Sequence, residues 1–221
     1  MLYLLTGSDR AKLSQKLMDM ICHEAKEGKE GQVLIVPEQF SHEAERRLCI
    51  AGGDTISRYA EVLSLSRMAD RVAAVHGGAA ANYLDKGGRL LSMALAAENA
   101  APRIRLFAAG LRRPEFLVDV LSMIEELSSY CLEPEDLLRA AAGMEGQFAQ
   151  KLEELALLYE SYLAVCSTGS ADPSQKLGTL GRSLSDSSWA EGRTFYVDGF
   201  SDFTGAELAI LEALMKEGES L

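Results

Sequence analysis

Short apolar runs alternate with helical patterns early in the chain, and this alternation limits the fold more than any other feature. Four runs have the apolar character of strands buried on both faces of a parallel sheet: residues 2–5, 33–36, 55–57 with their neighbours, and 194–197. A helical pattern follows each run, including one from about residue 60 to residue 75. Strands and helices in alternation predict an α/β fold with a parallel sheet.

From about residue 79 to residue 181 the pattern predicts helices and no strand. Four prolines stand near plausible helix starts: Pro102, Pro114, Pro134 and Pro173. Asp172 is suited to cap the helix that begins at Pro173. We therefore expect residues 1–78 to form the first part of the α/β core, residues 79–181 a helical insertion, and residues 182–221 the returning strand and helix.

Charge argues against strong, independent binding to nucleic acid. The 221 residues include 22 basic and 33 acidic side chains, and the net charge of −11 repels a polyanion. Arginines at positions 103, 105, 112 and 113 form the one basic cluster, which could contact DNA phosphates or solvate a corner between helices.

Cysteines and targeting signals bound the function further. Cys22, Cys49, Cys131 and Cys166 are scattered without metal-ligand spacing, so the sequence predicts neither a zinc site nor an iron–sulfur cluster. The N-terminus lacks the features of a signal peptide, and no apolar run is long enough to span a membrane. We expect a cytoplasmic protein without a membrane partner.

The first loop has the layout of a phosphate-binding loop, in which backbone N–H groups and a helix dipole hold phosphates. It reads Thr6, Gly7, Ser8, Asp9, Arg10, Ala11, Lys12 and Leu13. If Lys12 is the phosphate lysine, Thr6 and Ala11 replace glycines, and Leu13 replaces the Ser/Thr that binds Mg²⁺. Asp9 adds a negative charge where phosphate would sit. These changes predict a degenerate nucleotide site, although an ordinary strand–helix connection remains the alternative.

A second constellation is the apolar strand that ends in Asp198. An acid at the carboxyl end of a parallel strand is where such folds hold Mg²⁺ through water, as a Walker B aspartate does. Proteins with such folds that hydrolyse nucleotides usually have a Glu next, which orients the attacking water, and here that residue is Gly199. We expect no catalytic residue, and Asp198 could instead cap the following loop.

A third constellation is Val-Pro-Glu-Gln-Phe at residues 36–40. The Gln39 amide and the Phe40 ring could hydrogen-bond to a base or stack on one. Alternatively, Pro37 ends the strand and Phe40 anchors the core.

Together and in order, these pieces resemble the N-terminal region of the B subunit of the AddAB-type (also called RexAB) ATP-dependent helicase–nuclease of bacteria. Apart from the opening strand and loop, the matching segments are VLIVPEQFSHEAERRL (33–48), EVLSLSRMADRV (61–72), KLEELALLYESYL (151–163) and FYVDGFSDFTGAELAILEAL (195–214). The Val-Pro-Glu-Gln-Phe and Val-Asp-Gly-Phe motifs are the specific ones.

The resemblance implies an incomplete RecA-like P-loop domain, like domain 1A of superfamily 1 helicases, with a helical insertion like domain 1B. It implies repair and recombination at double-strand DNA ends, in a heterodimer with an A subunit that carries the conventional motor. ATP and Mg²⁺ would be the ligands of the loop. The second RecA-like domain, the nuclease domain and the iron–sulfur cysteines of the family lie outside the matching region.

The resemblance also implies a path for single-stranded DNA: Glu38, Gln39, Phe40, Ser64, Ser66 and Arg67. We expect a scaffold that binds the A subunit and binds DNA weakly, without hydrolysing ATP or cutting DNA. The family often retains Gly-Lys-Ser/Thr, of which only Lys12 is present, whereas Gly199 agrees with the family pattern. The alternatives are a small P-loop kinase or other transferase, and a purely helical interaction module.

Overall fold

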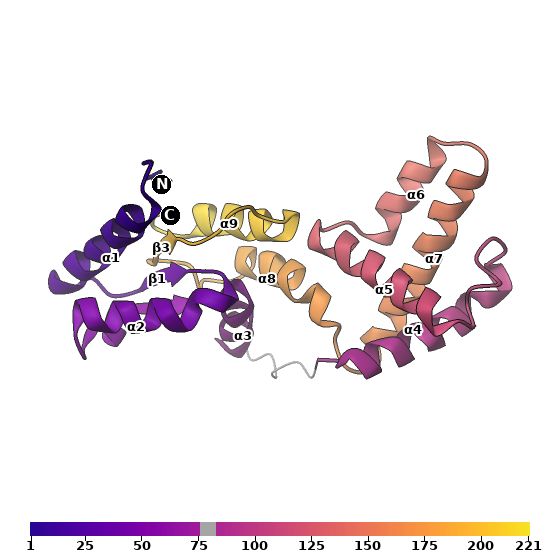
Figure 1. The fold of residues 1–221 in the computed structure, drawn as a ribbon, viewed down its shortest axis with the longest axis horizontal. Helices are drawn as coiled ribbons and strands as arrows, with labels where there is room; N and C mark the ends of the chain where they lie inside the picture. The colour runs from indigo at the N-terminus through magenta and orange to yellow at the C-terminus, as the bar shows by residue number, and fades with distance from the viewer. Residues whose placement is uncertain (76–82) are drawn as a thin grey trace. The chain divides into compact units, whose positions relative to one another are not determined.

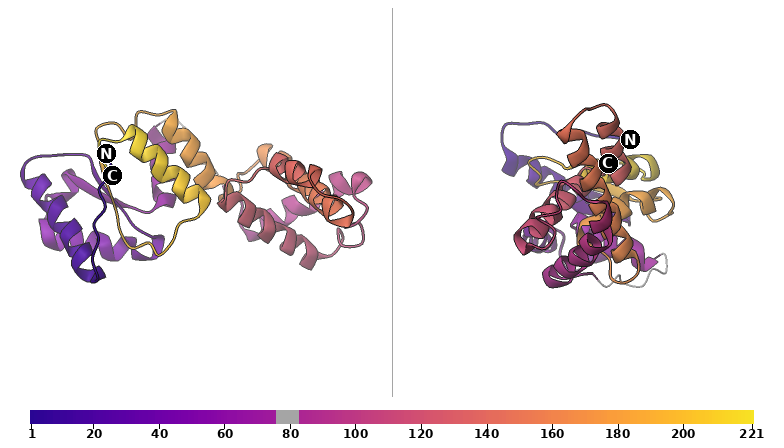
Figure 2. Two further views of the ribbon diagram at one scale, coloured as in Figure 1. Left: turned by 90° about the horizontal axis from the view of Figure 1, so that it is seen from above. Right: turned by 90° about the vertical axis from the view of Figure 1, so that its right-hand side faces the viewer.

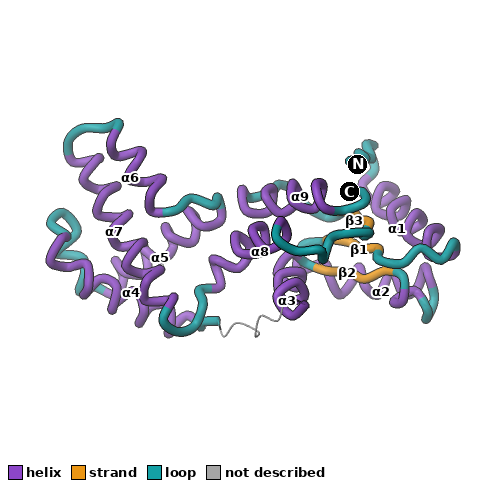
Figure 3. Tube along the Cα trace, turned by 180° about the vertical axis from the view of Figure 1, so that it is seen from behind, coloured by secondary structure: helices purple, strands orange, loops and turns teal. Residues whose placement is uncertain are grey.

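Three strands form one parallel sheet in the computed structural model, which describes residues 1–75 and 83–221. They are β1 (Gln32–Ile35), β2 (Ala60–Leu63) and β3 (Thr194–Val197), in the order β2-β1-β3 (Figure 3). Gln32 lies opposite both Ala60 and Thr194. The α/β fold with a parallel sheet is confirmed, as are the strands expected at 33–36 and 194–197. Because the strands are parallel, their carboxyl ends meet at one edge.

The chain divides into two compact units (Figure 1). Met1–Ala80 and Leu177–Leu221 build the unit that holds the sheet, and Ala81–Lys176 build a helical unit. The boundary expected between residues 78 and 79 lies outside the described residues.

Two helices, α1 (Arg10–Lys26) and α2 (Ser41–Gly52), cover one face of the sheet. Alternate strand residues point toward them, because successive side chains in a strand point to opposite faces. The core on this face contains Met18, Ile21, Cys22, Ala25, Leu34, Val36, Ala44, Leu48, Ile56, Ala60, Val62 and Tyr196.

Helices α3 (Leu65–Val75), α8 (Lys176–Ser185) and α9 (Gly205–Glu217) cover the other face. The sheet contributes Val33, Ile35, Leu63 and Phe195 to the core on this side. Helices α8 and α9 lie side by side (Figure 2), and a Cβ added to Gly181 would lie 4.0 Å from the Ile210 backbone nitrogen. Helix α9 begins with a reciprocal capping box between Thr204 and Glu207. Burial on both faces explains why β1 and β3 are apolar after their first residues, Gln32 and Thr194.

The strand expected at residues 2–5 is wrong. Residues 1–7 have no regular structure, and the side chain of Leu4 is 81% exposed. The Tyr3 N–H donates to the Leu221 carbonyl at 2.9 Å, and the Leu221 N–H donates to the Met1 carbonyl at 3.0 Å. The Met1 amino group also donates to the Glu219 carbonyl at 3.3 Å, and these few bonds do not make a strand of the run.

The strand expected at residues 55–57 begins later in the structure. Residues 55–57 lead into a 3₁₀ turn, η2 (Ile56–Arg58), and the strand follows as β2. The helix expected from about residue 60 therefore begins only at Leu65. Ala, Glu and Leu favour helices, but parallel pairing with β1 and burial of Ala60 and Val62 override that weak preference.

Four α-helices lie in the described part of the second unit, residues 83–176: α4 (Lys86–Ala100), α5 (Pro114–Ser129), α6 (Pro134–Ala142) and α7 (Gln147–Ser167). Pro114 and Pro134 start α5 and α6 as expected. Short turns η1 (Glu38–Phe40), η3 (Ala101–Arg103) and η4 (Pro173–Gln175) complete the chain, and the Asp172 carboxylate caps η4 as expected. None of the helices in the described ranges is long and apolar enough to cross a membrane.

The helical unit is closed at the point where the chain enters and leaves it. The Leu84 N–H donates to the Ala171 carbonyl at 3.0 Å, within a parallel bridge between Tyr83 and Ala171. Next to this bridge, the buried Asp172 carboxylate accepts from the Tyr162 hydroxyl at 2.6 Å and pairs with the Arg89 guanidinium at 3.1 Å. Burial and the bond to Asp172 raise the pKa of Tyr162.

A buried carboxylate on α7 holds the loop after η3. Glu154 accepts from the backbone N–H groups of Arg105, Leu106 and Phe107 at 2.8–3.0 Å. Burial raises the pKa of Glu154, but the backbone hydrogen bonds and one from Gln150 outweigh it, so the pKa lies below its ordinary value. The ionised form therefore stabilises the helical unit.

We predict that Glu154→Gln lowers the free energy of unfolding at neutral pH by about 1–3 kcal/mol, because buried N–H groups lose their full acceptor. The folded-state pKa is depressed, so the stabilisation is present above the ordinary pKa and disappears as pH falls through the folded value. Urea unfolding followed by circular dichroism from pH 7 to pH 3 measures both effects. The exposed neighbour Glu153→Gln is the matched control, and equal losses in the two variants would contradict the prediction.

Candidate functional site

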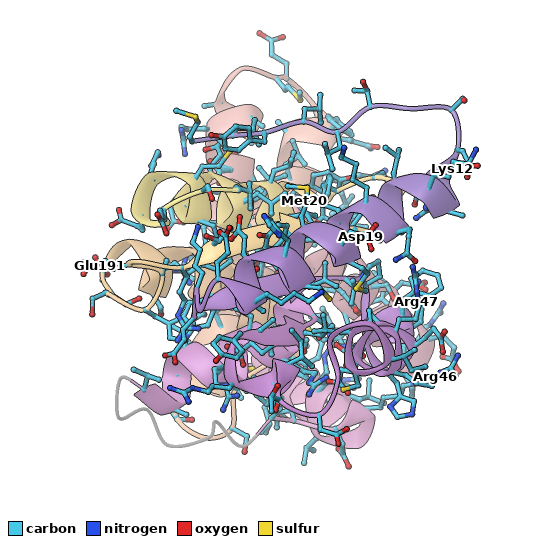
Figure 4. All side chains as sticks on the ribbon, turned by 90° about the vertical axis from the view of Figure 1, so that its left-hand side faces the viewer. Lys12, Asp19, Met20, Arg46, Arg47 and Glu191 are labelled. Atoms are coloured by element: carbon cyan, nitrogen blue, oxygen red, sulfur yellow. The ribbon has the colours of Figure 1, made fainter. Side chains whose placement is uncertain are left out.

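The first constellation lies at the start of α1, where the helix N-terminus is capped from within the chain. The Asp9 carboxylate accepts from the Lys12 backbone N–H at 3.2 Å. The Lys12 ammonium lies 3.5 Å from the same carboxylate, and its side chain is 85% exposed (Figure 4). Anions bind at helix N-termini through free N–H groups and the helix dipole. Here a carboxylate of the protein takes that position.

The other residues of this loop offer little to a phosphate. Thr6, Ser8 and Ala11 are exposed, and Leu13 supplies an apolar side chain in place of a hydroxyl. The Leu13 side chain also lies close to Gly7, since a Cβ added to Gly7 would be 3.3 Å from Leu13 Cδ2. The side chain at the magnesium position thus packs against the loop.

The second constellation is tied to the third through a glycine. The Asp198 N–H donates to the Ile35 carbonyl at 3.0 Å, so the chain is still in the ladder when it reaches Gly199. Gly199 has φ +90°, and a Cβ there would lie 3.1 Å from Pro37 Cδ. The backbone conformation and the approach of Pro37 therefore favour a glycine where the two motifs meet. A glycine also has no side chain that could orient a water molecule.

An arginine that the sequence did not single out joins this junction. Arg10, at the start of α1, donates from Nη2 to the Gly199 carbonyl at 2.5 Å. The two residues are 189 positions apart, so no local pattern could signal their contact. This bond links the first loop to the loop after β3.

The Asp198 carboxylate is half-buried, and no hydrogen bond or ion pair between described residues uses it. The alternative that it caps the following loop therefore finds no support in the geometry. Among residues 1–75 and 83–221, no three His, Cys, Asp or Glu side chains lie close enough together to hold a metal ion. Each of the four cysteines is a free thiol, and burial raises the pKa of Cys22.

The residues that the resemblance places on a DNA path lie on η1 and at the start of α3. The Ser64 hydroxyl donates to the Glu38 carboxylate and accepts from the Arg67 N–H at 3.2 Å. These contacts bring the loop after β1 and the loop after β2 together. Gln39 is exposed, and Ser66 lies in the first turn of α3.

Aromatic rings add to this carboxyl edge of the sheet. Phe40 is 47% exposed and belongs to none of the buried clusters, so the alternative that it anchors the core is wrong. Its ring comes within 3.7 Å of the position that a Cβ on Gly199 would take. Phe200 and Phe203 stack on each other with ring centres 4.8 Å apart. Phe203 carries no signal of its own in the sequence, and only placing its loop at this edge would have identified it.

The structure thus groups the predicted residues into separate sets. Glu38, Ser64 and Arg67 form one set, and Lys12 is held by Asp9 in another. No contact between described residues joins Lys12 to Asp198, the two groups that would share a magnesium nucleotide.

We predict that Gly199→Ala costs more stability than Gly192→Ala. Both glycines have positive φ, +90° and +67°, so both substitutions carry backbone strain of about 1–2 kcal/mol. Only at position 199 does the new Cβ also press against Pro37, since nothing lies within 4 Å at position 192. Chemical denaturation compares the two variants, and equal costs would show that the approach of Pro37 is not tight.

Known proteins are similar in sequence to most or all of this chain. The AddB N-terminal family model matches residues 4–221. A relative from Symbiobacterium thermophilum, named as the B subunit of an ATP-dependent helicase/deoxyribonuclease, is 31% identical over 100% of the chain and 20% of its own length. A relative of the same name from Pelotomaculum thermopropionicum is 34% identical over 83% of the chain and 16% of its own length.

A third relative with this name, from Caldanaerobacter subterraneus, is 30% identical over 84% of the chain and 16% of its own length. The chain thus spans about a fifth or less of these curated relatives. The family model covers nearly every residue of the chain, and this match decides its family. The parallel sheet, with both specific motifs at its carboxyl edge, agrees with the match. The chain belongs to the AddB N-terminal family.

Proposed function

We propose that this chain is part of the B subunit of an ATP-dependent helicase–nuclease and serves there as a DNA- and partner-binding scaffold that does not hydrolyse ATP. One observation carries the proposal: the Asp9 carboxylate occupies the N-terminus of α1 and pairs with Lys12, where a phosphate would have to bind. The name of the relatives supports the assignment to the B subunit.

Three further features support the absence of ATP turnover. Leu13 lacks a hydroxyl for Mg²⁺, and Gly199 lacks a carboxylate for the attacking water. Among the described residues, no hydrogen bond or ion pair joins the Asp198 carboxylate to the Lys12 side chain. In this proposal the sheet is a RecA-like domain that has kept its shape without its chemistry. The helical unit is its insertion.

The carboxyl edge supports a role in binding single-stranded DNA. Such sites combine cations that follow the backbone with rings on which bases stack. The edge offers Arg67 and the exposed ring of Phe40, beside the amide of Gln39. Because the net charge is −11, this binding should be weak and should fall steeply with salt.

Within a complete enzyme, the motor would be supplied by an A subunit, and the substrate would be a double-strand DNA end in the cytoplasm. The purely helical interaction module is ruled out as an alternative by the parallel sheet. A P-loop kinase or transferase would need the nucleotide site that Asp9 occupies, and the first experiment distinguishes it.

We predict that the full-length B subunit, assayed without its partner, shows no DNA-stimulated ATP hydrolysis and no rise in melting temperature with millimolar ATP and Mg²⁺. A ligand at 100 times its Kd would add about 2.7 kcal/mol of stability, which is readily detected. Lys12→Ala is compared with Lys16→Ala, another exposed lysine one turn along α1. Hydrolysis that is abolished only by Lys12→Ala would overturn the proposal and favour the enzyme alternative.

We also predict that Phe40→Ala weakens binding of a fluorescent single-stranded oligonucleotide by about 1–3 kcal/mol, the usual contribution of one stacked base. Fluorescence anisotropy at low and moderate salt measures the affinity. Ile50→Ala is the control, because it removes another exposed apolar side chain near the end of α2, the helix that follows Phe40. This variant should leave the DNA affinity unchanged. If both variants bind DNA like the unchanged protein, Phe40 does not lie on the DNA path.

A further inference from the structure

We propose that Glu45 is a positioning residue that holds Arg67 away from DNA and thereby sets the affinity of the carboxyl edge. The inference rests on the proposed function, because it assumes that Arg67 faces DNA phosphates. It adds a residue of α2 that lies outside the two specific motifs and outside the expected DNA path.

The contact itself is close and crosses the edge of the sheet. Arg67 Nη1 lies 2.6 Å from Glu45 Oε1. Glu45 belongs to α2 on one face of the sheet, and Arg67 belongs to α3 on the other. The pair therefore spans β2, which is the outer strand of the sheet.

The pair is also open to an approaching ligand. The side chains of Arg67 and Glu45 are 46% and 38% exposed, respectively. Both line a cavity of about 810 Å³ that follows β2 from Tyr59 to Leu63. A phosphate can reach the guanidinium without any movement of the backbone.

The backbone of Arg67 is fixed independently of this ion pair. Its N–H donates to the Ser64 hydroxyl at 3.2 Å, and that hydroxyl donates to the Glu38 carboxylate. The start of α3 therefore keeps its position when the side chain changes partner. Only the guanidinium has to turn from a carboxylate to a phosphate.

Competition follows from the chemistry of the guanidinium. Carboxylate and phosphate use the same planar set of N–H donors, so one excludes the other from that face of the arginine. DNA must displace Glu45 before it can use Arg67 fully. Exposed ion pairs are weak, so the carboxylate should reduce DNA affinity by a small factor, about 1.5- to 5-fold.

The test measures single-stranded DNA affinity by fluorescence anisotropy with a labelled oligonucleotide, using variants of the complete protein. Glu45→Gln should tighten binding about 1.5- to 5-fold at low salt. Because one more phosphate is neutralised, the slope of log affinity against log salt should steepen by roughly 0.7.

Glu30→Gln is the matched control. It removes the same charge and breaks the same kind of pair, since Glu30 binds Arg58 at 3.0 Å. Both residues precede their strands and so lie at the amino end of the sheet, away from the proposed DNA path. This variant should leave the affinity and the salt slope unchanged.

A double variant, Glu45→Gln with Arg67→Gln, should lose the gain of Glu45→Gln. Equal gains in Glu45→Gln and Glu30→Gln would overturn the inference, because net charge would then explain the effect. If Arg67→Gln weakens binding and Glu45→Gln does not strengthen it, the inference fails while the DNA role stands. If Arg67→Gln leaves affinity unchanged, the assignment of Arg67 to the DNA path fails, and the role of Glu45 falls with it.

Discussion

Parallel pairing of β1 with both of its neighbours is the interaction on which the rest of the sheet-containing unit depends. Gln32 pairs with Ala60 on one side and with Thr194 on the other, so segments far apart in sequence meet on one strand. The four residues of β1 are almost completely buried. Because every strand points the same way, the loops carrying Glu38, Ser64 and Asp198 emerge at one edge of the sheet.

At that edge, the chain pairs several of its own charged and polar side chains. Asp9 caps α1 and pairs with Lys12, Glu38 accepts from Ser64, and Glu45 binds Arg67. A working nucleotide or DNA site usually leaves donors unpaired until its ligand arrives. Carboxylates take these positions here, which agrees with the strongly negative charge of the chain. This arrangement is what supports the proposed scaffold role.

Sequence is informative where local pattern and tertiary structure agree. Residues 33–36 and 195–197 are apolar because both faces of the sheet are covered, and the strands predicted at 33–36 and 194–197 are confirmed. Ala60–Leu63 reads as helix because its residues also favour helices, and only pairing with β1 makes them a strand. Residues 2–5 have the composition of a buried strand, but composition does not reveal that Leu2, Tyr3 and Leu4 stay exposed.

The same limit applies to the site. The Asp9 cap could be predicted, because a cap involves residues three positions apart. The Arg10–Gly199 and Glu45–Arg67 contacts could not, because they join elements whose proximity is set by the sheet. At Gly199, the sequence shows only that a glutamate is absent. The structure shows that Pro37 Cδ would lie 3.1 Å from any Cβ at this position.

The bridge between Tyr83 and Ala171 joins the beginning of the helical unit to its end. A segment whose two ends are already hydrogen-bonded together can change in length or content without altering the distance that the flanking chain must span. Evolution can therefore lengthen, shorten or exchange these helices while the sheet keeps its register. In that sense the unit is a replaceable module.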